Sequence, residues 1–63
     1  MEQVHESNAF EVGERVWDKR RQEWGTVIHI DTVGITVRFA DSMRIWAVVY
    51  SKPEHLDYLT KWR

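Results

Sequence analysis

The residues best suited to bind a ligand lie in one short basic and aromatic stretch. Lys19, Arg20 and Arg21 follow closely on Trp17, and Trp24 comes three residues after Arg21. Guanidinium groups are charged, directional hydrogen-bond donors, and Trp and Arg are enriched at the energetic centres of protein interfaces. The same pair of residue types suits single-stranded nucleic acid, because bases stack on rings while cations neutralise phosphates. The stretch therefore predicts a binding site for a protein or a nucleic acid.

A plainer interpretation of the same stretch stays open. Its cations can pair with the neighbouring acids Glu14, Asp18 and Glu23, and a run of surface charges usually does no more than that. Trp17 and Trp24 can in the same way cover one end of the fold beneath arginine stems. The sequence alone does not choose between a binding site and a solvated loop.

A second candidate face lies farther along the chain. Arg44, Trp46 and Tyr50 are separated by even numbers of residues, so they share one face of an extended strand. Arg38 precedes them on the neighbouring predicted strand. This set also combines cations with aromatic rings, and it is the alternative partner-binding surface.

Catalytic and metal-binding patterns are not found. His5, His29 and His55 are scattered without metal-ligand spacing, and the chain has no Cys. No serine stands in a nucleophile elbow, and no glycine-rich loop could hold a phosphate. We therefore expect a non-enzymatic protein with no catalytic residue, no metal site and no cofactor. An active site formed at the pore of an oligomer is the less favoured alternative.

Composition and charge set limits on these functions. The 63 residues are 43% hydrophobic and 30% charged, which fits one globular domain. The formal charge is −1, and the four acids of residues 1–14 leave a mildly basic remainder. A net charge so close to zero favours a protein partner over a nucleic acid. The chain shows no signal peptide or spanning segment, so we expect a cytoplasmic protein that binds no membrane, with its oligomeric state left open.

Short strands are the elements that would position these residues. Residues 1–9 show no apolar period and are expected to form a flexible acidic tail, with a single domain over residues 10–63. Strands are expected over residues 14–19, 24–31, 35–39 and 43–50. Gly25 marks a bulge or a close approach inside the second strand. The Ser51-Lys52-Pro53-Glu54 segment has the form of a capping box and predicts a helical turn after it.

The register of the fourth strand decides which side chains are buried. A three-residue loop, Ala40-Asp41-Ser42, would place Phe39 opposite Met43. Alternate residues then point inward at Ile45, Ala47 and Val49, and outward at Arg44, Trp46, Val48 and Tyr50. A slip of one residue would invert every one of these side chains. With this register the predicted core is Val16, Val27, Ile30, Ile35, Val37, Phe39, Ile45 and Leu56.

These elements describe an all-β fold, a small barrel of four to five antiparallel strands with a short helical turn near the C-terminus. The segment Phe10-Glu11-Val12-Gly13-Glu14-Arg15-Val16, followed by Trp24-Gly25-Thr26-Val27-Ile28, resembles the opening of SH3-like (Tudor-like) barrels of bacteria and phages. It is also similar to the C-terminal Tudor-like domain of UvrD/PcrA-type helicases. The segment from Pro53 to Leu59 resembles the closing turn of such barrels. The chain departs from the pattern where Glu14 replaces the usual Asp and where Trp24 precedes the glycine.

The resemblance implies recognition rather than catalysis. It implies a protein-interaction module, an adaptor or a phage or bacterial modulator of a nucleic-acid machine such as RNA polymerase or an associated factor. Direct nucleic-acid binding through the arginine and aromatic residues is the alternative. Since one fold serves many functions, the resemblance does not identify the partner.

Overall fold

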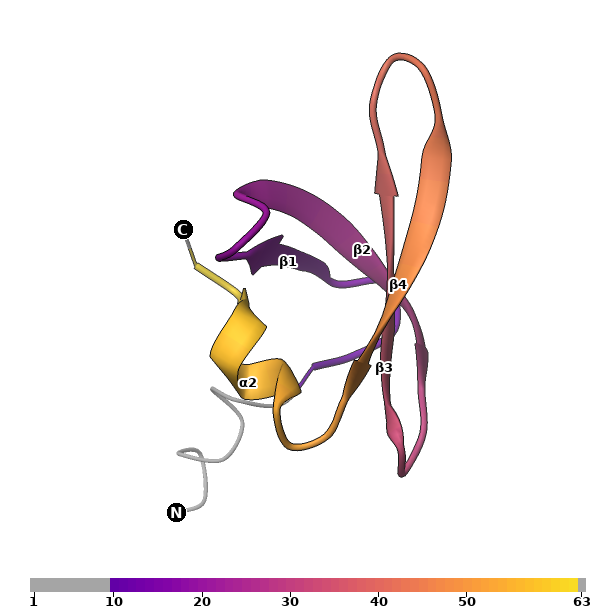
Figure 1. Cartoon of the computed structure of the whole chain (residues 1–63). Helices are drawn as coiled ribbons and strands as arrows, with labels where there is room; N and C mark the ends of the chain where they lie inside the picture. The colour runs from indigo at the N-terminus through magenta and orange to yellow at the C-terminus, as the bar shows by residue number, and fades with distance from the viewer. Residues whose placement is uncertain (1–9, 63) are drawn as a thin grey trace.

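The computed structural model describes residues 10–62 and consists mostly of antiparallel strands (Figure 1). The elements are β1 (Arg15–Asp18), β2 (Glu23–Ile30), β3 (Gly34–Ala40), β4 (Ile45–Ser51), the short helix α2 (His55–Tyr58) and β5 (Leu59–Thr60). They form one five-stranded sheet in the order β4-β3-β2-β1-β5. The all-β class is confirmed, and each predicted strand overlaps an observed one. The predicted tail, residues 1–9, lies outside the described residues.

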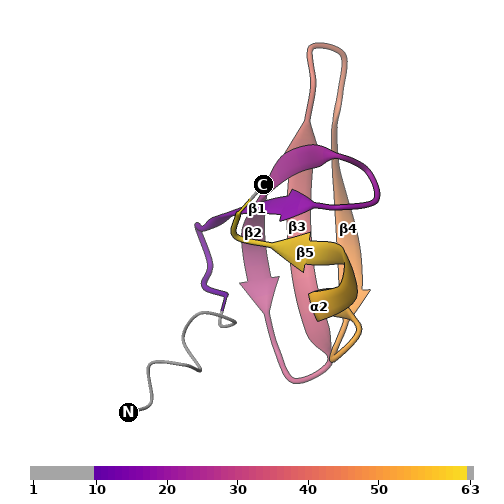
Figure 2. The ribbon, with the colours of Figure 1, turned by 90° about the vertical axis from the view of Figure 1, so that its left-hand side faces the viewer.

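The sheet is curled rather than flat. Tyr50 on β4 donates a hydrogen bond to Asp18 on β1, although β3 and β2 separate the two strands in the sheet. Neighbouring strands lie about 4.8 Å apart, so β4 and β1 would be about 14 Å apart in a flat sheet. The two views agree that β1 and β5 lie over one face of β3 and β4 (Figures 1 and 2). The curl thus brings the first and fourth strands together.

The core lies inside this curl. Its buried hydrophobic residues are Val16, Val27, Ile35, Val37, Phe39, Tyr50 and Leu59, and Ile30 packs partly buried against them. The prediction is wrong for Ile45 and Leu56, whose residues are 68% and 41% exposed. Leu59 is buried in place of Leu56 because it lies in β5, where it pairs with Asp18.

The predicted register of β4 is wrong by three residues, because Phe39 pairs with Trp46 rather than with Met43. Ala40 pairs with Ile45, so the loop between β3 and β4 has four residues rather than three. The Asp41 carboxylate stabilises this longer loop by accepting the backbone N–H groups of Met43 at 2.8 Å and Arg44 at 2.9 Å. Because the register shifts by an odd number of residues, the side chains of the strand are inverted, and Tyr50 turns inward while Ile45 turns outward.

Two further local predictions have different outcomes. The capping box does not form, because Ser51 stays paired with Gly34 and the N-cap residue Glu54 makes no side-chain cap bond. The close approach at Gly25 is confirmed. A Cβ atom there would lie 2.5 Å from Val37 Cγ1 and 2.7 Å from Phe39 Cε1. The irregularity of β2 falls later, where the pairing with β3 shifts register between Val27 and His29.

Candidate functional site

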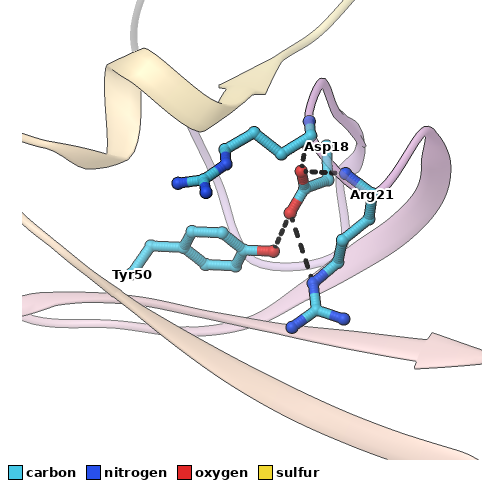
Figure 3. A network of polar contacts seen from close by, with 4 residues as sticks. Asp18, Arg21 and Tyr50 are labelled. Atoms are coloured by element: carbon cyan, nitrogen blue, oxygen red, sulfur yellow. Dashed lines mark hydrogen bonds and ion pairs between the residues drawn. The ribbon is translucent and has the colours of Figure 1, made fainter.

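Asp18 fixes the shape of the loop between β1 and β2. Its carboxylate is buried and accepts the backbone N–H groups of Arg20 at 2.8 Å and Arg21 at 2.9 Å. The second carboxylate oxygen accepts a hydrogen bond from the Tyr50 hydroxyl and lies 3.6 Å from Arg21 Nε (Figure 3). Gln22, with a φ of 59°, closes the loop by donating its N–H to the Asp18 carbonyl at 2.7 Å. The backbone that carries the two arginines is therefore anchored to the core.

The Tyr50 hydroxyl is a permanent donor in this network. Burial raises the pKa of Tyr50 well above its usual value, and the hydrogen bond to Asp18 and the negative charge of that residue raise it further. The phenol stays protonated at neutral pH as a result, and it connects β4 to the loop at the end of β1.

A groove of about 740 Å³ lies beside this network, between the β1–β2 loop, β4 and α2. We call it the arginine groove and define it by Arg20, Arg21, Val48, Tyr50, Glu54 and Tyr58. The Arg20 guanidinium carbon is 5.1 Å from the centroid of the Tyr58 ring, and that of Arg21 is 5.7 Å from the centroid of Phe39. The groove therefore combines two arginines with apolar and aromatic surface. Sequence reasoning missed Glu54 and Tyr58, because only the return of the chain after β4 brings α2 to the loop.

The two predicted tryptophans lie on the opposite face of the sheet. Trp17 and Trp24 are cross-strand partners, with ring centroids 5.4 Å apart and an interplanar angle of 64°. Arg15 lies over the Trp24 ring at 4.8 Å, and Arg38 reaches the same face through its pairing opposite Thr26. We call Arg15, Trp17, Trp24 and Arg38 the outer aromatic face. The predicted patch is thus divided, with Arg20 and Arg21 at the groove and the tryptophans on the outer aromatic face. Lys19 is exposed in the β1–β2 loop and lines neither of these sites, but a separate hollow with Phe10 and Leu56.

The alternative face is divided as well. Tyr50 is buried, and Trp46 is half-buried and stacked on Phe39 with ring centroids 5.9 Å apart. Arg44 lies over the outer side of this stack, 4.4 Å from the Trp46 ring centroid. The prediction that Trp46 and Tyr50 point outward is wrong because of the register of β4, whereas Arg38 is exposed as predicted.

Metal centres, membrane-spanning helices and known relatives are the other features that could identify a function. Within residues 10–62, no group of three or more His, Cys, Asp or Glu is placed to hold a metal ion. No helix in this part of the chain has the length and apolar character needed to cross a membrane. His29 is exposed and lies 3.2 Å from Asp31. Comparisons with protein-family models, with curated proteins and with solved structures found no match for the chain.

Proposed function

We propose that this protein is a non-enzymatic protein-interaction module whose arginine groove binds an acidic segment of a larger partner. The observation that carries the proposal is the anchoring of Arg20 and Arg21 by Asp18. Holding the backbone in place lowers the entropy lost when these side chains bind, which is the usual benefit of preorganisation.

Two arginines and two acids, Asp18 and Glu54, line the groove, and the case for an acidic ligand rests on the arginines. Asp18 is satisfied by two backbone N–H groups, by the Tyr50 hydroxyl and by Arg21. Arg20 makes no ion pair with any residue between 10 and 62, so its charge is open to a carboxylate from a partner. Tyr58 and Val48 supply the apolar contact area that protein interfaces need around such an anchor.

We also propose a finer description of the fold as an SH3-like (Tudor-like) barrel. The antiparallel strand order, the helical turn between β4 and β5 and the Tyr50–Asp18 contact across the curl support it. The proposal keeps the expected cytoplasmic location and the expected partner class, a nucleic-acid machine such as RNA polymerase or an associated factor.

Nucleic-acid binding is the second candidate, and the outer aromatic face is the observation that favours it. Two tryptophans and two arginines gather there on three neighbouring strands. The two rings already contact each other edge to face, however, and the formal charge of the chain is −1. Both features weaken stacking on bases and binding to phosphates, so we place this function second.

The test is a pull-down from a lysate of the source cells with three baits, each used with and without nuclease. The baits are the wild type, the Arg20→Ala/Arg21→Ala variant and the Arg38→Ala/Arg44→Ala variant, which removes the same charge elsewhere. We expect one set of proteins to be retained by the wild type and by the control variant regardless of nuclease. Retention by Arg20→Ala/Arg21→Ala should fall about 30-fold, the equivalent of about 2 kcal/mol.

Two results would contradict the proposal. Equal retention by all three baits would show that the groove is not the site. Retention that disappears after nuclease would favour the nucleic-acid function, and anisotropy titrations of labelled oligonucleotides at two salt concentrations would then identify the strand type. Urea denaturation of each bait checks the fold. We expect Arg38→Ala/Arg44→Ala to lie within about 0.5 kcal/mol of wild type. Arg20→Ala/Arg21→Ala should lose about 1 kcal/mol and stay folded, because Arg21 pairs with the buried Asp18.

A further inference from the structure

The strand β4 lies at one edge of the sheet with unpaired backbone groups. It pairs with β3 on one side, and no strand of residues 10–62 lies on its other side. The N–H of Lys52 donates to the Val33 carbonyl, and the N–H of Asp41 donates to the Arg44 carbonyl. Antiparallel pairs alternate along a strand, so the even-numbered residues of β4 face β3. The N–H and C=O groups of Ile45, Ala47 and Val49 consequently point away from the sheet.

This edge lacks the features by which sheets usually avoid association. Residues 45–51 contain no charge and no proline, and their pairing with β3 shows no register shift. Ile45 is 68% exposed and Val49 is 65% exposed, and both lie on the outer side of the strand. Both views show the β3–β4 hairpin extending past the rest of the molecule, which leaves its edge accessible (Figures 1 and 2).

We propose that a second copy of this chain pairs with β4 in antiparallel fashion, around a two-fold axis at Ala47. In this register Ala47 faces Ala47 of the second copy, and Ile45 faces Val49 of the second copy. The residues with outward-pointing backbone groups are the ones that meet, as antiparallel hydrogen bonding requires. Each exposed apolar side chain gains an apolar cross-strand neighbour, the type of pair that stabilises sheets. The two sheets would join into one.

Charge disfavours one of the two adjacent registers. A shift that centres the axis on Val48 would place Arg44 opposite Lys52 of the second copy at both ends of the strand, and like charges opposite each other destabilise a sheet. With the axis at Ala47, Arg44 faces Tyr50 of the second copy instead. The strand can therefore pair with itself without like charges opposite each other, and for that reason we favour a second copy over an unrelated strand. The proposal does not depend on the function of the arginine groove.

Sedimentation velocity over a wide concentration range tests the pairing with two variants that differ in one side chain. The wild type should show a reversible monomer–dimer equilibrium. Ile45→Lys/Val49→Lys places Lys opposite Lys twice, and we expect its dimer dissociation constant to rise at least about tenfold. Ile45→Lys/Val49→Glu places Lys opposite Glu twice, and we expect it to dimerise again. A wild type that stays monomeric throughout, or a Lys/Lys variant that dimerises as well as the wild type, would overturn the proposal.

Cysteine cross-linking tests the register itself, because the chain has no native Cys. Hydrogen-bonded antiparallel partners have Cα atoms about 5.5 Å apart, within the range of about 4.4–6.8 Å that a disulfide spans. Ala47→Cys should cross-link to itself under a glutathione redox buffer. A mixture of Ile45→Cys and Val49→Cys should give mainly the mixed dimer, and the exposed control Val12→Cys should not cross-link. Homodimers of Ile45→Cys and Val49→Cys in equal amount with the mixed dimer would contradict this register.

Discussion

Asp18 is a single buried carboxylate that ties together a loop and two distant strands. Its carboxylate oxygens accept hydrogen bonds from the backbone N–H groups of Arg20 and Arg21 and from the Tyr50 hydroxyl. Burial of an acid is costly unless such partners are present, so each partner matters more here than it would at the surface. The position of the two arginines depends on this residue, although neither the charge nor the spacing of Asp18 distinguishes it from a surface acid.

A double-mutant cycle measures this dependence. Tyr50→Phe removes one donor and should lower the free energy of unfolding by about 1–2 kcal/mol. Asp18→Ala removes the acceptor of three donors and should lower it by about 3 kcal/mol. Because the two residues share one hydrogen bond, the double variant should lose less than the sum of the single variants by about 1 kcal/mol or more. Urea denaturation supplies all four values, and additive losses would show that the bond contributes nothing.

His55 should make the stability of the protein depend on pH in the mildly acidic range. The residue is buried, its ring packs against Phe10 with centroids 5.7 Å apart, and its Nδ1 has no hydrogen-bond partner within the described chain. Burial lowers the pKa of His55 below its usual 6.5, the nearby charge of Lys52 lowers it further, and Glu54 opposes both. The folded protein therefore takes up a proton at His55 less readily than the unfolded chain does.

The contribution of His55 to the free energy of unfolding should thus not change with pH above 6.5. It should decrease as the pH falls below that value. His55→Phe keeps an aromatic ring against Phe10 and should remove this decrease. Urea denaturation at about pH 7.5 and about pH 5.5 checks it. The pKa values of Asp31 and Asp41 are lowered from 3.8 by backbone hydrogen bonds, so those two acids act only at lower pH. An equal loss in wild type and variant would assign the effect to other groups.

At the scale of the elements, three hairpin loops share one pattern of side-chain to backbone hydrogen bonds. Asp18, Asp31 and Asp41 each stand at the end of a strand and accept the backbone N–H groups of the residues two and three positions later. Aspartate is common in turns for this reason. The sequence shows all three aspartates, but the loop predicted after β3 starts at Ala40 and has three residues, whereas the Asp41 turn closes a four-residue loop between Ala40 and Ile45. The resulting shift of three residues, an odd number, is the physical cause of every wrong side-chain direction on β4.

A matched pair of substitutions tests the observed register. Val37 on β3 is fully buried and Ile45 on β4 is 68% exposed, and threonine has a high strand propensity at both positions. Val37→Thr buries a hydroxyl and should cost about 1–3 kcal/mol. Ile45→Thr should change the free energy of unfolding by less than about 0.5 kcal/mol in dilute protein. Equal costs at the two positions would support the three-residue loop instead.

At the scale of the whole molecule, the sequence predicts the strands but not what the curl brings together. Alternation in β3 and the turn residues around it suffice for the all-β class and for most of the core. The contact of Tyr50 with Asp18 joins residues 32 positions apart and depends on the curl of four strands, which no local pattern encodes. The division of the basic and aromatic stretch between two faces follows from strand parity, since Val16 and Asp18 are buried while Trp17 lies between them.

Within residues 10–62 the arginine groove and the outer aromatic face are therefore separate surfaces, and we expect the partner to bind at the groove. The most direct measurement is a ¹H–¹⁵N correlation spectrum of the labelled protein, titrated with a partner recovered by the wild-type bait. We predict shifts at the amides of residues 18–22 and 48–51 and at the Nε of Arg20 and Arg21, with the indole signals of Trp17 and Trp24 unchanged. Shifts centred on those two indoles and on Arg38, with the groove signals unchanged, would contradict it.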